Sequence, residues 1–312
     1  MKVLISSRSF GKINSGAIEL LKNQGLEPVI NPHGKKLNEQ EIIDLLDNSV
    51  GIIAGTENIT KKIISYNNSL KVISRYGIGL DNVDLKAAEQ RNVLVYNTPE
   101  TPKIAVAELT ITLILNLLKK VVNVDKNAKK DVWKPEIGNL LSTKTVGIVG
   151  LGRIGKQLVK FLQPFNCKIL VYEIKPDKEF ISKYKIDLVS LDKLMKKSDV
   201  ISLHVSYNKQ THHLIGKKEL DMMKDSAILI NTARGGLIDE KLLYTYLKDK
   251  KIAGAAIDVF EDEPNTGKLK NLENIILTPH IGTFTIETRK HMEIEAANNL
   301  INGLKKVKIL WK

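Results

Sequence analysis

Three residues of this chain have the types needed for proton transfer at a carbonyl group that lies next to a carboxylate. Arg234, Glu263 and His280 each follow an apolar stretch within a few residues. An arginine can hold a carboxylate through two parallel hydrogen bonds, and a carboxylate beside an imidazole fixes the tautomer and favours the charged ring. Together they would supply a carboxylate anchor, an orienting acid and a proton-transfer group. Each alone is more often structural than catalytic, and counting along the chain does not establish that the three meet.

A glycine-rich turn indicates a second kind of chemistry. The stretch 144–155 has the pattern of a short buried strand that breaks into a turn, and a helix is expected over 156–165. Within the turn, Gly150, Gly152 and Gly155 have the G-x-G-x-x-G spacing, which lets a pyrophosphate approach the backbone at the N-terminus of the helix. The same spacing also occurs in purely structural turns, so the motif alone is weak evidence.

The next strand strengthens this interpretation. A strand is expected over 168–173, and it ends in Glu173. This acid lies at about the separation expected for a carboxylate that binds the ribose hydroxyls of the adenosine half. The turn and the acid together predict a site for a nicotinamide dinucleotide.

The elements that position these residues alternate between strand and helix patterns. Helices are expected between strands over 3–6, 27–31, 50–54, 71–75, 93–96, 200–204, 227–231, 253–257 and 275–277. This alternation predicts an α/β fold with parallel sheets covered by helices on both faces.

A change of domain is expected where turn-forming residues interrupt this alternation. The segment 97–102 contains two prolines, and a long apolar helix is expected over 104–118. The lysine-rich segment 119–134 is expected to be solvated or to form an arm. The final helix, expected over 286–302, is long enough to cross back and cover the first sheet.

Length and charge limit the function classes. The 312 residues are enough for two domains, each with its own core. The net charge of +13 would suit nucleic acid or an anionic substrate. The basic residues are almost all lysines spread along the chain, without the arginine clusters and interleaved aromatics of nucleic-acid surfaces, so no nucleic-acid partner is expected.

The compartment is predicted from what the N-terminus and the apolar runs contain. Cys167 is the only cysteine, which excludes a disulfide within the chain and a cysteine-based metal cluster. The first ten residues have a strand pattern in place of a signal peptide, and no apolar run has transmembrane length. A cytoplasmic protein without a membrane partner is expected.

The chain resembles the D-isomer-specific 2-hydroxyacid dehydrogenase family, and is most similar to its short D-3-phosphoglycerate dehydrogenase-like members. The resemblance is carried by 75–84, 106–109, 147–155, 229–239, 256–264 and 278–282. It implies a flavodoxin-like substrate domain of two segments, 1–98 and 283–312, and a Rossmann NAD-binding domain, 99–282, inserted between them. It also implies a binding cleft, an NAD cofactor, a 2-hydroxy or 2-oxo acid substrate and a homodimer.

The resemblance assigns a role to each site residue. His280 would be the acid and base, Glu263 its partner, and Arg234 the anchor of the substrate carboxylate. The substrate loop would be Arg75, Tyr76, Gly77, Ile78 and Gly79, which holds the same carboxylate through backbone N–H groups. The cofactor residues would be Gly150, Gly152, Arg153, Ile154, Gly155, Glu173, His204, Thr232, Ala233, Asp258 and Gly282, with Asp258 on the nicotinamide carboxamide.

Two departures from the family pattern lie on the cofactor side. The family usually has aspartate where this chain has Glu173, which still repels a 2′-phosphate, so NAD is expected over NADP. The loop after His204 usually starts with proline, whereas here it reads 206–208 as Ser-Tyr-Asn. His212 and His213, in the same loop, are expected to be exposed or packing residues, and no metal site is expected.

The substrate and the class of function stay open. The resemblance favours 3-phosphoglycerate, hence serine biosynthesis, and Arg75 or Lys134 could meet its phosphate. Hydroxypyruvate or glyoxylate reduction is the alternative. A non-enzymatic NAD-sensing protein on the same fold, like the family's corepressors, is another. Glu263 argues against the formate dehydrogenase branch, which has glutamine there.

Overall fold

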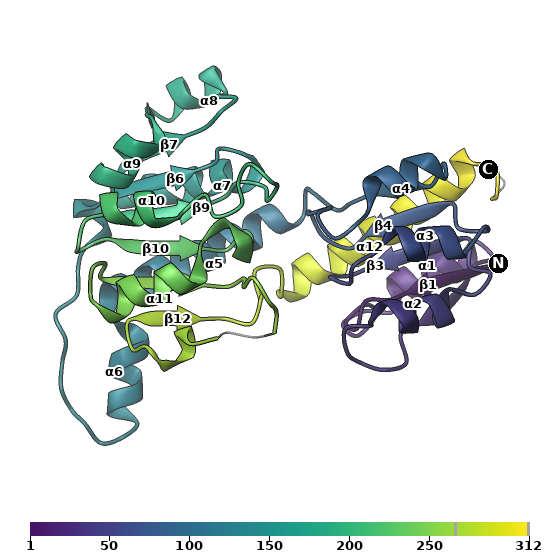
Figure 1. The fold of residues 1–312 in the computed structure, drawn as a ribbon, viewed down its shortest axis with the longest axis horizontal. Helices are drawn as coiled ribbons and strands as arrows, with labels where there is room; N and C mark the ends of the chain where they lie inside the picture. Colours follow the sequence, from purple (N-terminus) through teal and green to yellow (C-terminus); the bar gives the residue numbers. More distant parts are fainter. Residues whose placement is uncertain (265–266, 311–312) are drawn as a thin grey trace. The chain divides into compact units, whose positions relative to one another are not determined.

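The computed structural model describes residues 1–264 and 267–310 and divides the chain into two compact units (Figure 1). One unit, here called the discontinuous unit, combines Met1–Pro102 with Phe284–Lys312. The other, the inserted unit, is Lys103–Thr283. Each is an α/β structure around one parallel sheet, which confirms the predicted fold class.

The sheet of the discontinuous unit has five parallel strands in the order β2-β1-β3-β4-β5. The strands are β1 (Lys2–Ile5), β2 (Glu27–Ile30), β3 (Gly51–Ala54), β4 (Val72–Arg75) and β5 (Leu94–Tyr96). The helices are α1 (Gly16–Asn23), α2 (Glu39–Leu46), α3 (Lys61–Tyr66), α4 (Leu85–Gln90) and α12 (Ile286–Lys306). This is the flavodoxin-like strand order.

The last helix completes the core of this unit. Ser74 Oγ, buried in β4, donates to the carbonyl of Ala296 in α12 at 2.8 Å. Leu300 packs on the strand residue Gly51, where a Cβ would lie 2.6 Å from a Leu300 methyl group. The prediction that the final helix covers the first sheet is therefore confirmed, and the helix is one turn longer than expected.

The sheet of the inserted unit has seven parallel strands in the order β12-β11-β10-β9-β6-β7-β8. The strands are β6 (Thr145–Val149), β7 (Lys168–Tyr172), β8 (Asp187–Leu188), β9 (Val200–Leu203), β10 (Ile228–Asn231), β11 (Gly254–Ile257) and β12 (Ile275–Leu277). The helices are α5 (Pro102–Lys119), α6 (Val121–Ala128), α7 (Arg153–Leu162), α8 (Lys178–Lys183), α9 (Leu191–Lys197), α10 (Lys217–Met222) and α11 (Glu240–Lys248).

The chain reverses its direction of travel across this sheet between β6 and β9. The strands β6, β7 and β8 run to one edge, and the following strands start again on the other side of β6. Ligands of open α/β sheets bind beyond the carboxyl ends of the strands at such a point. The strands β9, β10 and β11 are buried along their whole length, which explains why their sequences are apolar apart from Ser202 and Asn231.

The segment expected to be solvated contains a helix that the sequence did not predict. Within 119–134, the helix α6 covers Val121–Ala128, and none of its residues is buried. A helix that packs no face into a core leaves no apolar stripe in the sequence. No helix in the described ranges is long and apolar enough to cross a membrane.

Candidate active site

The three residues with acid, base and anchoring chemistry follow three neighbouring strands. Arg234 follows β10, Glu263 follows β11 and His280 follows β12, and these strands pair in parallel. Parallel strands all finish at the same end of the sheet. The segments that carry the three residues therefore leave the sheet side by side. The inserted unit therefore brings together, at the carboxyl ends of its strands, the loops that the sequence singled out.

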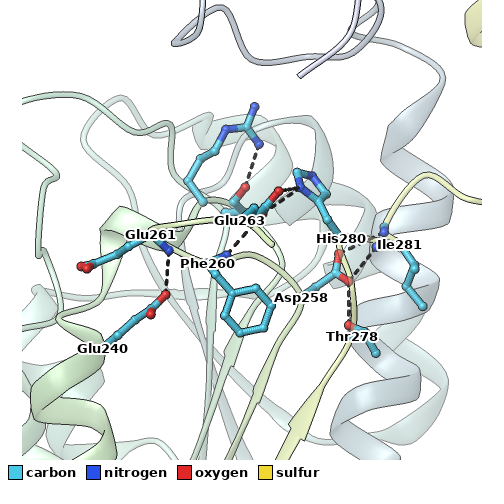
Figure 2. Close-up of polar contacts among 11 residues, drawn as sticks. Glu240, Asp258, Phe260, Glu261, Glu263, Thr278, His280 and Ile281 are labelled. Atoms are coloured by element: carbon cyan, nitrogen blue, oxygen red, sulfur yellow. Dashed lines mark hydrogen bonds and ion pairs between the residues drawn. The ribbon is translucent and has the colours of Figure 1, made fainter. Parts of the chain in front are cut away.

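Glu263 and His280 form a hydrogen-bonded pair. His280 Nδ1 lies 2.9 Å from each oxygen of the Glu263 carboxylate, and Figure 2 shows the two side chains pointing toward each other. About a third of each side chain is exposed. A carboxylate at Nδ1 selects the tautomer with its proton there, and in that tautomer Nε2 is the nitrogen that can accept a proton.

The turn that carries His280 is held by a buried carboxylate. Asp258 Oδ1 accepts from Thr278 Oγ1 at 2.6 Å and from the N–H of Ile281 at 2.8 Å (Figure 2). Its Oδ2 accepts from the N–H of Gly282 at 3.0 Å. Burial raises the pKa of Asp258. His280 itself has a left-handed φ of 54°, which non-glycine residues rarely adopt without surrounding support. Both oxygens of Asp258 are thus used within the protein.

The Arg234 loop contacts the Glu263 loop through the backbone. A Cβ on Gly235 would overlap the carbonyl group of Phe260, so only glycine fits there. Asn231, at the end of β10, donates from Nδ2 to the carbonyl of Arg234 at 2.8 Å. Its Oδ1 accepts from the N–H of Ala233 at 3.0 Å. Asn231 therefore fixes the shape of the loop, a role that the sequence left unassigned although a polar residue closing an apolar strand was the available signal.

The glycine turn between β6 and α7 has the shape that a pyrophosphate needs. Gly150 has φ +100°, and a Cβ there would lie 2.8 Å from the carbonyl group of His204. A Cβ on Gly155 would overlap the Gly150 carbonyl oxygen, so helix and turn pack closely. At Gly152 a Cβ would meet no atom within 4 Å. Space beside Gly152 and the first N–H groups of α7, which begins with Arg153 and Ile154, together fit a dinucleotide phosphate.

Glu173 contacts the same turn. Its Oε2 accepts from the N–H of Leu151 at 2.7 Å, and its Oε1 accepts from the N–H of Lys175 at 2.9 Å. The longer glutamate side chain thereby connects the end of β7 to the glycine turn. Each carboxylate oxygen has a second lone pair, which is available to a ribose hydroxyl.

Two more of the expected cofactor residues lie beside neighbouring strand ends. His204, after β9, forms a hydrogen bond between its Nε2 and Ser202 Oγ at 2.8 Å. Its buried Nδ1 has no hydrogen-bond partner in the described part of the chain. Burial lowers the pKa of His204 to about 4, so the ring is neutral at pH 7. Thr232, after β10, is buried and pairs with Thr110 Oγ1 at 3.0 Å.

The expected substrate loop belongs to the discontinuous unit and follows β4. Arg75 is buried, and its Nη1 donates to the carbonyl of Tyr76, so its guanidinium is folded onto its own loop. The N–H of Gly77, at φ +147°, donates to the Arg75 carbonyl at 3.0 Å. The N–H groups of Ile78 and Gly79 have no protein acceptor among residues 1–264 and 267–310. Two of the three N–H groups are therefore available to a carboxylate.

Comparison with known proteins agrees with this geometry. Residues 111–282 match the model of the D-isomer specific 2-hydroxyacid dehydrogenase, NAD binding domain. The chain therefore belongs to the D-isomer specific 2-hydroxyacid dehydrogenase family, and the matched segment is the NAD binding domain of that family.

Individual relatives carry different names. A D-3-phosphoglycerate dehydrogenase of Methanocaldococcus jannaschii is 37% identical over 295 residues, which cover 93% of this chain and 55% of that protein. A glyoxylate reductase of Thermococcus litoralis is 38% identical over 294 residues, which cover 91% of this chain and 86% of that protein. The chain thus spans about half the length of the first relative and most of the second.

A solved structure extends the likeness to a ligand complex. The D-lactate dehydrogenase of Aquifex aeolicus, complexed with NAD and lactic acid, matches with a TM-score of 0.86 and 27% identity. The match covers 99% of this chain and 98% of that chain. The two parallel-sheet units are therefore those of this family.

Proposed function

We propose that this protein is an NAD-dependent oxidoreductase that interconverts D-2-hydroxy acids and 2-oxo acids. The observation that carries the proposal is the His280–Glu263 pair, held at 2.9 Å beside the Arg234 loop. A purely structural ion pair would not need a left-handed histidine fixed by a buried carboxylate.

The protein's residues divide the remaining chemistry among them. NAD, when bound, exchanges a hydride with C2 of the substrate. His280 Nε2 takes the hydroxyl proton during oxidation and returns it during reduction, while Glu263 stabilises the imidazolium. Arg234 holds the substrate carboxylate through paired hydrogen bonds.

The proposal extends to domains and assembly. Residues 99–282 would bind NAD, and 1–98 with 283–312 would bind the substrate through the loop after β4. A homodimer is supported by Trp133 and Ile137, each 93% exposed in the inserted unit, because large apolar side chains at such exposure suit an interface. Sedimentation at several protein concentrations tests this assembly.

Two substrate types remain candidates. The family resemblance and the Methanocaldococcus relative favour 3-phosphohydroxypyruvate, the 2-oxo form of 3-phosphoglycerate. The inward-folded guanidinium of Arg75 favours a smaller acid, such as hydroxypyruvate or glyoxylate, because that side chain is already bonded to the loop. The coverage of the glyoxylate reductase relative also favours the smaller acid.

The test is NADH oxidation with a panel of 2-oxo acids. We expect turnover with at least one acid, and kcat/KM at least about tenfold higher with NADH than with NADPH because Glu173 repels a 2′-phosphate. The acid with the highest kcat/KM decides between the phosphorylated and the smaller substrates. Tight NADH binding with no turnover of any acid would contradict the enzyme and support an NAD-sensing protein.

A further inference from the structure

A second histidine–carboxylate pair lies next to the proposed catalytic pair. His213 Nε2 is 2.6 Å from Glu261 Oε1, and Glu261 is two residues before Glu263. Each side chain of this pair is about one-third exposed. The proposed proton transfer uses neither residue.

The Glu261 end of the pair is part of a tightly bonded loop. The N–H of Glu261 donates to Glu240 Oε1, at the start of α11, at 2.7 Å (Figure 2). The N–H of Phe260 donates to Glu263 Oε1 at 3.3 Å. The loop between β11 and Glu263 is therefore held from outside at Glu261 by two contacts, one to its backbone and one to its side chain.

The His213 end is held by the loop that follows β9. The N–H of His213 donates to the carbonyl of Gly236, two residues beyond Arg234, at 2.8 Å. Its ring stacks on His212 with centroids 3.9 Å apart and an interplanar angle of 25°. His212 Nδ1 in turn lies 3.1 Å from Tyr207 Oη.

Tyr207 also contacts the Arg234 loop. A Cβ on Gly236 would lie 2.6 Å from the Tyr207 ring, so the ring rests on the glycine backbone. Tyr207 belongs to the segment 206–208 that departs from the family pattern. Tyr207 and His213 therefore both contact the backbone two residues beyond Arg234, and His213 also contacts Glu261, while His212 lies between Tyr207 and His213.

We infer that His213 and Glu261 are positioning residues for catalysis: through their hydrogen bond, the loop after β9 sets the distance between Glu263 and His280 and the placement of the Arg234 loop. This rests on the proposed function. A second carboxylate oxygen, Asp239 Oδ2, lies 3.9 Å from His213 Nδ1. His213 thus connects three loops of the inserted unit to one another.

The partial exposure of His213 and Glu261 allows a positioning role to be distinguished from a role in folding stability. Partly exposed ion pairs contribute little to folding stability. A misplacement of about 1 Å in a catalytic group can lower turnover by about 100-fold. Loss of the pair should therefore change catalysis much more than it changes unfolding.

The experiment compares three variants of the full chain with the parent. His213→Ala removes the hydrogen bond, and His213→Gln keeps a side-chain N–H donor as the conservative rescue. Lys217→Ala, which breaks an exposed ion pair with Asp221 elsewhere in the same unit, is the control for loss of a surface charge pair. For each protein we measure kcat, KM, the pH profile of 2-oxo acid reduction, the Kd of NADH and Tm.

We expect His213→Ala to lower kcat by about 10- to 100-fold and to raise KM, because Arg234 is also displaced, with the Kd of NADH within about twofold of the parent. The alkaline limb of its pH profile should move to lower pH, since a displaced Glu263 stabilises the imidazolium less. His213→Gln should recover part of kcat, and Lys217→Ala should match the parent. Parental kcat and pH profile in His213→Ala would overturn the inference, as would a loss of kcat explained by a fall in Tm.

A measurement that does not need turnover separates this inference from the proposed function. If the parent reduces no 2-oxo acid, the proposed function fails. The NMR signals of the His280 ring in the parent and in His213→Ala then still report whether the pair sets the environment of His280. Unchanged His280 signals would contradict the positioning role.

Discussion

His204 and His280 follow two strands of the same sheet and have opposite environments. His204 is half-buried beside the hydroxyl of Ser202, with its Nδ1 fully buried, and burial lowers its pKa to about 4. His280 faces the carboxylate of Glu263 and stays partly exposed. Only the second histidine has a neighbour that stabilises the protonated ring, so only the second is suited to proton transfer.

Replacement of His204 tests the lowered pKa of this residue, because that pKa makes the free energy of unfolding depend on pH. The unfolded chain binds a proton at His204 near pH 6.5, while the folded chain binds it only near pH 4. Folded stability therefore falls as the pH drops through 6.5 and levels off below 4, with about 2 kcal/mol lost between pH 7 and pH 5. His204→Gln should remove this contribution, so the free energy of unfolding relative to the parent should rise by about 2 kcal/mol from pH 7 to pH 5.

Urea denaturation of both proteins at the two pH values measures this change. Replacement of the exposed His33 by glutamine is the control for the loss of one histidine. An equal difference between parent and His204→Gln at both pH values would show that His204 is protonated in the folded protein at pH 5.

Residue types were easier to predict than their bonds. The sequence indicated Arg234, Glu263 and His280 because each follows an apolar strand. It did not show that Glu173 bonds to the N–H of Leu151, or that Asp258 uses both oxygens on the turn 278–282. Spacing fixes where a side chain starts, whereas its partners depend on the path of the backbone around it.

At the scale of elements, the alternation of strand and helix was predictable because both sheets are parallel and buried. Strand ends differed from expectation by about one residue. The two-residue strand β8 and the helix α6 were missed. Neither buries a residue, so neither leaves the periodic apolar pattern from which elements are predicted.

The turn after β12 provides a test at this scale. Asp258→Asn places an amide NH₂ where a carboxylate oxygen now accepts from Gly282, which leaves a buried donor without an acceptor. We expect the free energy of unfolding to fall by about 1–3 kcal/mol. We also expect kcat to fall, because the left-handed His280 loses its support.

Thr278→Val is the matched control, since it removes only one of the three bonds to Asp258. Urea denaturation and steady-state kinetics of both variants separate the two effects. Parental stability in Asp258→Asn, with a weakened Kd for NADH as the only change, would mean that Asp258 serves the cofactor and not the turn.

At the scale of the whole molecule, the chain is two units with distinct sheet orders. In the seven-stranded sheet the direction change lies between β6 and β9, which are followed by the glycine turn and by His204. In the five-stranded sheet it lies between β1 and β3, one strand away from the loop after β4. The division of the chain came from the turn-forming segment 97–102 and from the family resemblance. The return of the chain to the first sheet followed from the length of the last helix.

The central claim is that the chain transfers a proton through His280 under the control of Glu263. Glu263→Gln keeps the shape of the partner and removes its charge, so the imidazolium is less stabilised and reduction should fail at lower pH than in the parent. His280→Ala removes the proton-transfer group, which typically contributes about 100- to 10,000-fold to the rate.

The most direct measurement is the pH profile of kcat/KM for 2-oxo acid reduction by the parent and both variants, with the Kd of NADH measured alongside. We predict that the alkaline limb of Glu263→Gln moves to lower pH. We also predict that His280→Ala loses about 100- to 10,000-fold in kcat while the Kd of NADH stays nearly the same. Near-parental turnover by His280→Ala, or an unchanged alkaline limb in Glu263→Gln, would contradict the account.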